Sequence, residues 1–206
     1  MANLNTPYGF KVIGYLDGQA PTFAPYQARI QSTYATPIFK GDPVTINAAG
    51  YLVKATPGTQ VSGIFDGCEY LSKAAGNRPQ WMPYWPGNGD AINDAAALII
   101  NSPSALFEVQ TGDGGPVTGA AVGNNISWAD AGGNTFNGIS GVYADFATIG
   151  NSAALPFRVV NYAGNGGYVT GAGFPQLAGN GSDGTTQYNT IIVAFNAQDF
   201  KVLTGV

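Results

Sequence analysis

The residues that most often carry enzymatic chemistry are scarce in this sequence. Its 206 residues include no histidine, which excludes the commonest general base, the serine–histidine–aspartate arrangement and most zinc sites. Glutamate occurs only at Glu69 and Glu108, whereas glycosidase chemistry needs two facing carboxylates. We therefore predict that the protein is not an enzyme, has no catalytic residues and needs no cofactor.

The aspartates indicate turns and not a metal or phosphate site. Aspartate in a tight turn hydrogen-bonds its own backbone, and several aspartates stand in such turns: Leu16-Asp17-Gly18, Gly41-Asp42-Pro43, Gly112-Asp113-Gly114 and Ser182-Asp183-Gly184. The Gly-rich stretches 112–115 and 164–167 lack the Gly-Lys-Ser/Thr ending of a phosphate-binding loop. Residues 179–186 offer calcium only Asp183, where a calcium loop needs spaced acidic ligands. We expect no bound metal.

The basic residues and the cysteine limit the partners further. The 8 lysines and arginines are spread singly from Lys11 to Lys201, so the clustered cations that nucleic-acid binding needs are missing. Residues 1–10 do not read as a signal peptide, and the longest apolar stretch, 95–100, is far shorter than the ~20 residues of a membrane helix. We expect no nucleic-acid partner, no membrane and synthesis in the cytoplasm. Cys68 is the single cysteine and is predicted to be a small strand residue without a disulfide.

Aromatic side chains are the remaining candidates for a binding function. Trp81, Tyr84 and Trp85 lie among prolines and form a stiff ridge. Three interpretations stay open: a contact for another protein, where Trp and Tyr dominate the binding energy; a stacking platform for a sugar; and a loop folded back over the core. The predicted protein-contact residues are these three together with Pro7, Tyr8 and Phe10.

The composition favours a protein that makes large contacts. Charged residues are 10% of the chain, well below the ~25% of an ordinary soluble domain. Apolar residues are 45%, so the chain is expected to fold. Interface cores are likewise poor in charge and rich in aromatic residues. The other interpretation is a secreted β protein with a neutral polar surface.

The elements that position these residues are predicted to be short β-strands. The 30 glycines and 13 prolines punctuate the chain throughout, a pattern typical of an all-β sandwich or barrel. The expected strands are 10–15, 26–30, 43–46, 51–54, 61–69, 96–101, 105–110, 126–129, 142–146, 157–162 and 190–196, the last of them buried on both faces. A turn or short helix is expected within 90–98, and long loops over 72–90, 112–123 and 163–187.

Local chemistry adds detail to this pattern. The stretch Asn47-Ala48-Ala49-Gly50 predicts a hairpin turn, and Gly63 and Gly67 predict a bulge or a close approach of two backbones. Residues 1–35 are predicted to form an N-terminal arm with the first strands. This arm either lies on another subunit or is an ordinary edge strand with loops. Residues 36–206 are predicted to form a β domain, which in one interpretation divides into subdomains 36–110 and 111–206.

Several segments resemble the capsid decoration, or cement, proteins of tailed bacteriophages. The opening is similar in Met1–Phe10 and in Tyr15-Leu16-Asp17-Gly18. The middle is similar in Phe39-Lys40-Gly41-Asp42-Pro43-Val44, Gly50-Tyr51-Leu52-Val53-Lys54-Ala55, Val61-Ser62-Gly63-Ile64 and Phe107-Glu108-Val109-Gln110. The end is similar in Val193–Phe200 and Thr204-Gly205-Val206. The similarity touches most of the chain and rests on the order and spacing of the segments.

This resemblance implies a β-barrel or β-tulip-like body, a homotrimer and attachment to the major capsid protein at threefold positions. The protein would then lie on the outer capsid surface of the virion, where it bridges capsomers and stabilises the head, after synthesis in the host cytoplasm. Two alternatives are kept: a tail or fibre adhesin that recognises carbohydrate, and a minor head or tail completion protein. The resemblance carries no catalytic residues to this chain.

Overall fold

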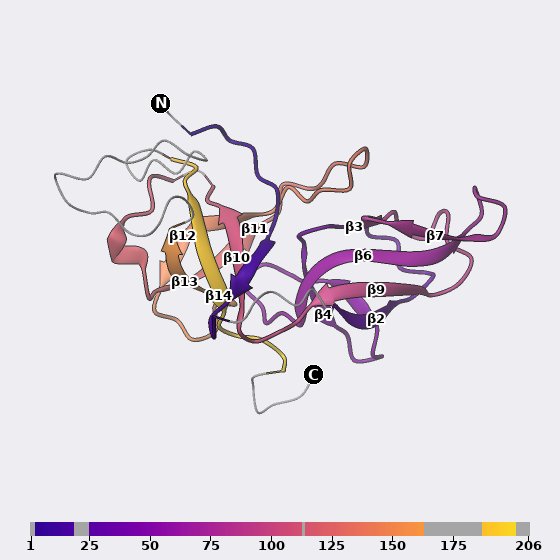
Figure 1. Cartoon of the computed structure of the whole chain (residues 1–206), viewed down its shortest axis with the longest axis horizontal. Helices are drawn as coiled ribbons and strands as arrows, with labels where there is room; N and C mark the ends of the chain where they lie inside the picture. The colour runs from indigo at the N-terminus through magenta and orange to yellow at the C-terminus, as the bar shows by residue number, and fades with distance from the viewer. Residues whose placement is uncertain (1–2, 19–24, 113, 163–186, 201–206) are drawn as a thin grey trace.

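The computed structural model describes residues 3–18, 25–112, 114–162 and 187–200 and shows two β-sheet lobes lying side by side (Figure 1). One lobe, here the core lobe, is a six-stranded antiparallel sheet. Its strands, in spatial order, are β1 (Lys11–Tyr15), β10 (Ala105–Gln110), β14 (Thr190–Phe195), β13 (Phe157–Tyr162), β11 (Asn125–Ala129) and β12 (Tyr143–Gly150). The all-β prediction is confirmed.

The other lobe, here the inserted lobe, is built by the chain between β1 and β10. Its main sheet has the order β2 (Tyr26–Ile30), β9 (Ala95–Ile100), β6 (Gly63–Ser72), β4 (Pro43–Ile46) and β5 (Leu52–Lys54). The far part of β6 pairs with β7 (Arg78–Met82), and a separate two-stranded sheet joins β3 (Ile38–Phe39) to β8 (Tyr84–Trp85).

A closed barrel is not confirmed. The sheet of the core lobe runs in open order from β1 to β12. Its far end returns toward β10 through one isolated parallel bridge, Thr111 to Ala144, beside a 2.9 Å bond from the Gly112 amide to the Ala144 carbonyl. The sheet is therefore curled, with a single bridge where a barrel would have a continuous ladder.

The chain passes from one lobe to the other at two places, between β1 and β2 and between β9 and β10. Residues 1–35 supply one strand to each lobe, because β1 pairs with β10 and β2 pairs with β9. The expected division between 110 and 111 follows β10, which itself belongs to the core lobe. The chain thus leaves the core lobe after β1 and returns to it between β9 and β10.

The local predictions on glycine and the hairpin are confirmed. The Asn47 side chain accepts hydrogen bonds from the Ala49 and Tyr51 amides, and Gly50 has a φ of 81° between β4 and β5. The pairing of β6 with β9 shifts register between Phe65 and Gly67, which is a bulge. A Cβ on Gly63 would stand 2.7 Å from the Ile100 carbonyl oxygen, so the backbones approach closely there.

The remaining local predictions have different outcomes. Residues 72–90 are not one long loop, since they contain β7 and β8. As the turn interpretation of 90–98 predicted, a turn and bends precede β9, and the one helical element among the described residues is a short 3-10 turn, η1 (Gly119–Ala121). The prediction that β14 is buried on both faces is confirmed, with Ile192 alone half-buried among its six residues. Of the expected loop 163–187, all but Gln187 lies outside the described residues.

Each lobe has its own hydrophobic core. The inserted lobe buries a cluster whose members all lie between residues 30 and 99: Ile30, Ile38, Val44, Leu52, Phe65, Cys68, Tyr70, Trp85, Ala91, Ala95, Ala97 and Ile99. The core lobe buries a larger, aromatic cluster around Phe107, Trp128 and Phe157. That cluster also takes in side chains from the inserted lobe, namely Ala55, Val61, Ile64 and Ile100. The two lobes therefore share an apolar boundary.

Candidate protein-binding surface

Two of the six predicted contact residues are buried inside the chain and cannot meet a partner. Trp85 has no exposed surface, and its indole N–H donates a 2.9 Å hydrogen bond to the Tyr34 carbonyl. Phe10 is buried in the core lobe, where its ring stacks on Phe157 with 4.3 Å between centroids. For these two residues the sequence interpretation is corrected. At these two positions the ring packs into the core of its own lobe.

Pro7 and Tyr8 are half-buried at the entrance to β1. The Tyr8 hydroxyl donates a 2.8 Å hydrogen bond to the Glu108 carboxylate on β10. Burial, together with this bond and the nearby negative charge, raises the pKa of Tyr8. Tyr8 therefore fastens the N-terminal segment to the core lobe.

Trp81 and Tyr84 do lie on the outside of the inserted lobe. Trp81 is 54% exposed, and its ring lies over the bulge at Gly67, where a Cβ would come within 2.9 Å of the indole. Tyr84 is half-buried and stacks on Phe39 with 5.5 Å between ring centroids. The glycine at the bulge thus makes room for an exposed indole.

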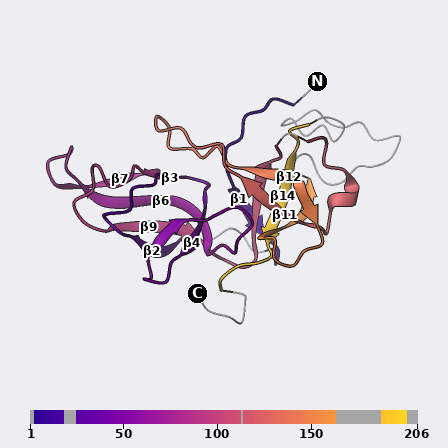
Figure 2. The same cartoon turned by 180° about the vertical axis from the view of Figure 1, so that it is seen from behind.

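A long loop from the core lobe reaches over this same part of the inserted lobe (Figures 1 and 2). We call residues 130–142, between β11 and β12, the crossing loop. Backbone hydrogen bonds attach it to Lys40, the residue after β3, from the Lys40 amide to the Gly138 carbonyl at 2.9 Å and from the Ser140 amide to the Lys40 carbonyl at 3.0 Å. A Cβ on Gly138 would stand 2.5 Å from Pro83, so only glycine permits this approach.

The tip of the crossing loop is held by its own hydrogen bonds. The Asn134 side chain accepts from the Phe136 amide at 2.8 Å, and the Asn137 side chain accepts from the Ile139 amide at 3.0 Å. The Asn134 backbone bonds to Gly138 and Ile139. On this fixed tip the Phe136 side chain is 98% exposed. The loop therefore presents a bare aromatic ring on an ordered turn.

A series of contacts links the crossing loop to the segment that carries Trp81. Ile139, 40% exposed, bridges to Lys40 in the backbone, and the Lys40 ammonium pairs with Asp66 at 2.7 Å. Asp66 is the extra residue of the bulge, and the Trp81 ring lies over the next residue, Gly67. We call this surface the aromatic face and define it by Trp81, Pro83, Tyr84, Phe136 and Ile139. The sequence interpretation missed Phe136, although Asn134 and Asn137-Gly138 are residues typical of a turn.

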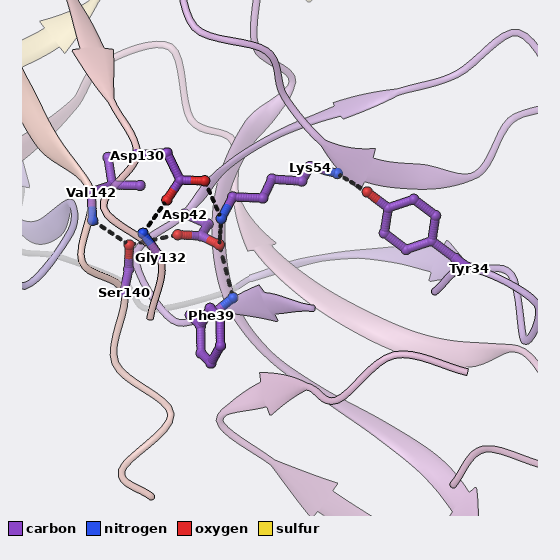
Figure 3. Close-up of polar contacts among 8 residues, drawn as sticks. All are labelled: Tyr34, Phe39, Asp42, Lys54, Asp130, Gly132, Ser140 and Val142. Carbon is purple, nitrogen blue, oxygen red and sulfur yellow. Dashed lines mark hydrogen bonds and ion pairs between the residues drawn. The ribbon is translucent and has the colours of Figure 1, made fainter. Parts of the chain in front are cut away.

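A buried polar joint fixes both ends of the crossing loop (Figure 3). The Lys54 ammonium lies 3.0 Å from the Asp42 carboxylate and 2.8 Å from the Asp130 carboxylate. Asp42 also accepts a 2.5 Å hydrogen bond from the Ser140 hydroxyl. Ser140 in turn accepts one from the Val142 amide, and Asp130 accepts one from the Gly132 amide. The joint connects the inserted lobe with both ends of the loop, at Asp130 and at Ser140, which we call its stems.

Burial sets the electrostatics of the joint. Asp42 has no exposed surface, and loss of water raises the pKa of its carboxyl against the opposing effects of Lys54 and of its hydrogen bonds. Burial disfavours the charged form of Lys54, but the Asp42 and Asp130 carboxylates outweigh it and raise the pKa of the ammonium. The prediction that Asp42 serves a turn is confirmed by its bond from the Phe39 amide. Its ion pair with Lys54 was not predicted.

The described residues add little that suggests another kind of site. They contain no group of three or more acidic or cysteine side chains placed to hold a metal ion, and none of their helices is long and apolar enough to cross a membrane. Cys68 is buried, as a small strand residue should be, and burial raises the pKa of its thiol to about 12. No protein-family model, curated protein or solved structure matches the chain.

Proposed function

We propose that this protein is a capsid decoration protein that binds the outer surface of a phage head through the aromatic face and bridges neighbouring capsomers. The observation that carries the proposal is Phe136, a phenylalanine 98% exposed on an ordered tip. Burying one such ring on binding stabilises a complex by about 1.5–3 kcal/mol. Its turn is already formed, so little conformational entropy is lost.

The charge of the surface supports a protein partner. The Lys40 ammonium and the Asp66 carboxylate pair with each other beside the aromatic face, and charged residues are only 10% of the chain. Neutral, aromatic surfaces are typical of the centre of protein interfaces. Binding is therefore expected to depend weakly on ionic strength.

Self-association supplies the remaining strength in this proposal. A homotrimer presents three copies of the aromatic face to a symmetric surface. Linked sites bind far more tightly than one site, because each later contact forms at high effective concentration. Modest contacts would then suffice to hold neighbouring capsomers together.

The test is a binding assay with purified phage heads that lack the protein, combined with light scattering for the oligomeric state. We expect a trimer, a saturable binding at hundreds of copies per head, and a loss of affinity of about tenfold or more for Phe136→Ala, since buried aromatic anchors dominate binding. Ile92→Ala is the control, because Ile92 is a 42% exposed apolar side chain on the inserted lobe that lies outside the aromatic face. A monomer without affinity for heads would refute the proposal, and a dozen copies per virion or fewer would favour a head or tail completion protein.

A further inference from the structure

Both stems of the crossing loop end on one buried ion pair. Asp130 opens the loop and contacts the Lys54 ammonium, while Ser140 near its end contacts the Asp42 carboxylate. Lys54 and Asp42 are themselves paired at 3.0 Å. We propose that Lys54 is a positioning residue for Phe136, a latch that holds the loop in its binding-competent shape. The effect of Lys54 on the loop follows from geometry alone and is tested by hydrogen exchange. Its effect on head binding also rests on the proposed function.

The apolar side chains of the loop tip do not anchor it. Phe136 is 98% exposed and Ile139 is 40% exposed, and the close contacts with the inserted lobe are made by Gly133 and Gly138, which bury no side chain. Between Asp130 and Ser140, the loop therefore depends on backbone hydrogen bonds and on the polar joint. Residues 133–137 are exposed, and an exposed backbone bond is readily exchanged for one to water, whereas the buried Asp42–Lys54 pair is not.

The position of Lys54 makes its charge difficult to replace. Its side chain is 12% exposed and that of Asp42 is fully buried, so water cannot take over the role of the ammonium. Without Lys54 the joint holds two carboxylates, Asp42 and Asp130, that repel each other across the lobe boundary. Removing one partner of a buried pair leaves the other charge uncompensated. The stem at Asp130 then loses its only ion pair among the described residues.

Hydrogen exchange of the free, full-length protein tests the latch without any partner. We expect Lys54→Met to speed exchange of the Gly138, Ile139 and Ser140 amides about tenfold or more, while the amides of β10 and β14 keep their protection. Lys54→Arg should restore much of the protection, because it keeps the charge. Arg29→Met is the matched control, since Arg29 pairs with Asp94 in an exposed position away from the loop.

A second variant covers the case in which Lys54→Met fails to fold. Asp130→Asn removes one charge from the half-buried end of the joint and leaves the Asp42–Lys54 pair intact. It should loosen the same loop amides, by a smaller factor. Unchanged exchange at the loop in the folded variants would overturn the inference.

A double-mutant cycle on head binding separates positioning from general stability. If Lys54 acts through Phe136, Asp130→Asn should weaken binding about fivefold to tenfold in the natural chain and by less than twofold in the Phe136→Ala background, because coupled residues are not additive. Equal losses in both backgrounds would refute the latch. If the loop loosens as expected but no chain binds heads, the latch stands and the proposed function fails. If the protein binds heads through Phe136 but neither Lys54→Met nor Asp130→Asn loosens the loop or weakens binding, the proposed function stands and the latch is refuted.

Discussion

The two lobes differ in where their hydrophobic cores come from. The buried members of the inserted-lobe core all lie between residues 30 and 99, within that lobe. The core lobe instead completes its cluster with Ala55, Val61, Ile64 and Ile100, which the inserted lobe supplies. In the hydrophobic packing the dependence therefore runs in one direction: the core-lobe cluster needs side chains of the inserted lobe, and the inserted-lobe cluster needs none of the core lobe.

Alternating strand geometry explains this arrangement. Successive residues of a strand point to opposite faces of the sheet. On β6, Ile64 faces the core lobe and Phe65 faces the inside of the inserted lobe; on β9, Ile100 and Ile99 divide in the same way. The neighbouring strands β6 and β9 therefore lie between the two cores and contribute side chains to both.

Removing a large aromatic ring from either core should have the largest effect on the stability of the two lobes. Phe65→Ala and Phe157→Ala each remove a buried phenylalanine and should each destabilise the protein by about 3–5 kcal/mol. In hydrogen exchange, Phe65→Ala should lower the protection of both lobes together. Phe157→Ala should lower it in the core lobe and leave β2, β6 and β9 protected. Equal loss in both lobes for Phe157→Ala would show that the dependence runs both ways.

A smaller substitution tests whether Ile64 on β6 packs in the core lobe. Ile64→Val removes one methylene from a residue that belongs to the inserted lobe in sequence but packs in the core lobe. It should cost about 0.5–1.5 kcal/mol, visible in urea unfolding, with the loss of amide protection concentrated in β13 and β14. Ile30→Val is the matched control, since Ile30 is equally buried but packs inside the inserted lobe. Greater loss in β2 than in β14 for Ile64→Val would contradict the assignment.

Low pH should destabilise the inserted lobe by protonating the Asp90 carboxylate. The Ser72 hydroxyl and the Ala74 amide donate to this carboxylate at 2.6 and 2.8 Å, and these bonds lower its pKa below the ordinary value of 3.8. Because the folded pKa is the lower one, the stabilisation is fully present above about 3.8 and is lost as pH falls through the folded pKa. The stability difference between the natural chain and Asp90→Asn, measured by urea unfolding, should therefore shrink below pH 3.8. A constant difference down to pH 2 would exclude the carboxylate as its cause.

The natural Cys68 serves as a reporter of local opening, so no further substitution is needed to introduce a label. Its thiol is buried in the inserted lobe, and burial raises its pKa to about 12. The thiolate is the reactive form, so labelling by a thiol reagent at neutral pH should be slow in the native protein and fast in denaturant. Phe157→Ala should leave the labelling slow, whereas Phe65→Ala should accelerate it. Fast labelling of the native chain would contradict the burial of Cys68.

Local sequence chemistry predicted much of the fold. The hairpin at Asn47–Gly50 and the roles of Gly63 and Gly67 follow from turn and bulge preferences that act over a few residues. Several strands, including 26–30, 43–46 and 105–110, have the predicted bounds. β7 and β8 were missed because Pro79 and Pro83 argue against strands. β7 tolerates Pro79 because it pairs only with β6 and forms a sheet edge.

The candidate site was less predictable because distant residues build it. The bond from Ser140 to Asp42 joins residues 98 positions apart, and the ion pair from Lys54 reaches across the lobe boundary to Asp130. Trp81 and Tyr84 were identified from residue type alone. Trp85 lies in the same stretch with the same chemistry, yet it is buried, because the side-chain direction depends on how β8 pairs with β3. Residue type indicates a binding surface, and strand register decides which side chains reach it.

The path of the chain through the two lobes also sets an order of events during synthesis. β1 is translated early, but its partner strand brings Glu108 opposite Lys11 only after the whole inserted lobe has been made. At the usual rate of about 5–20 residues per second, β1 waits roughly 5–20 s for β10. The inserted lobe holds its own core and is thus able to fold on the ribosome first. It then serves as the template on which β1 and β10 meet, so a slow step in the inserted lobe delays the assembly of the entire protein.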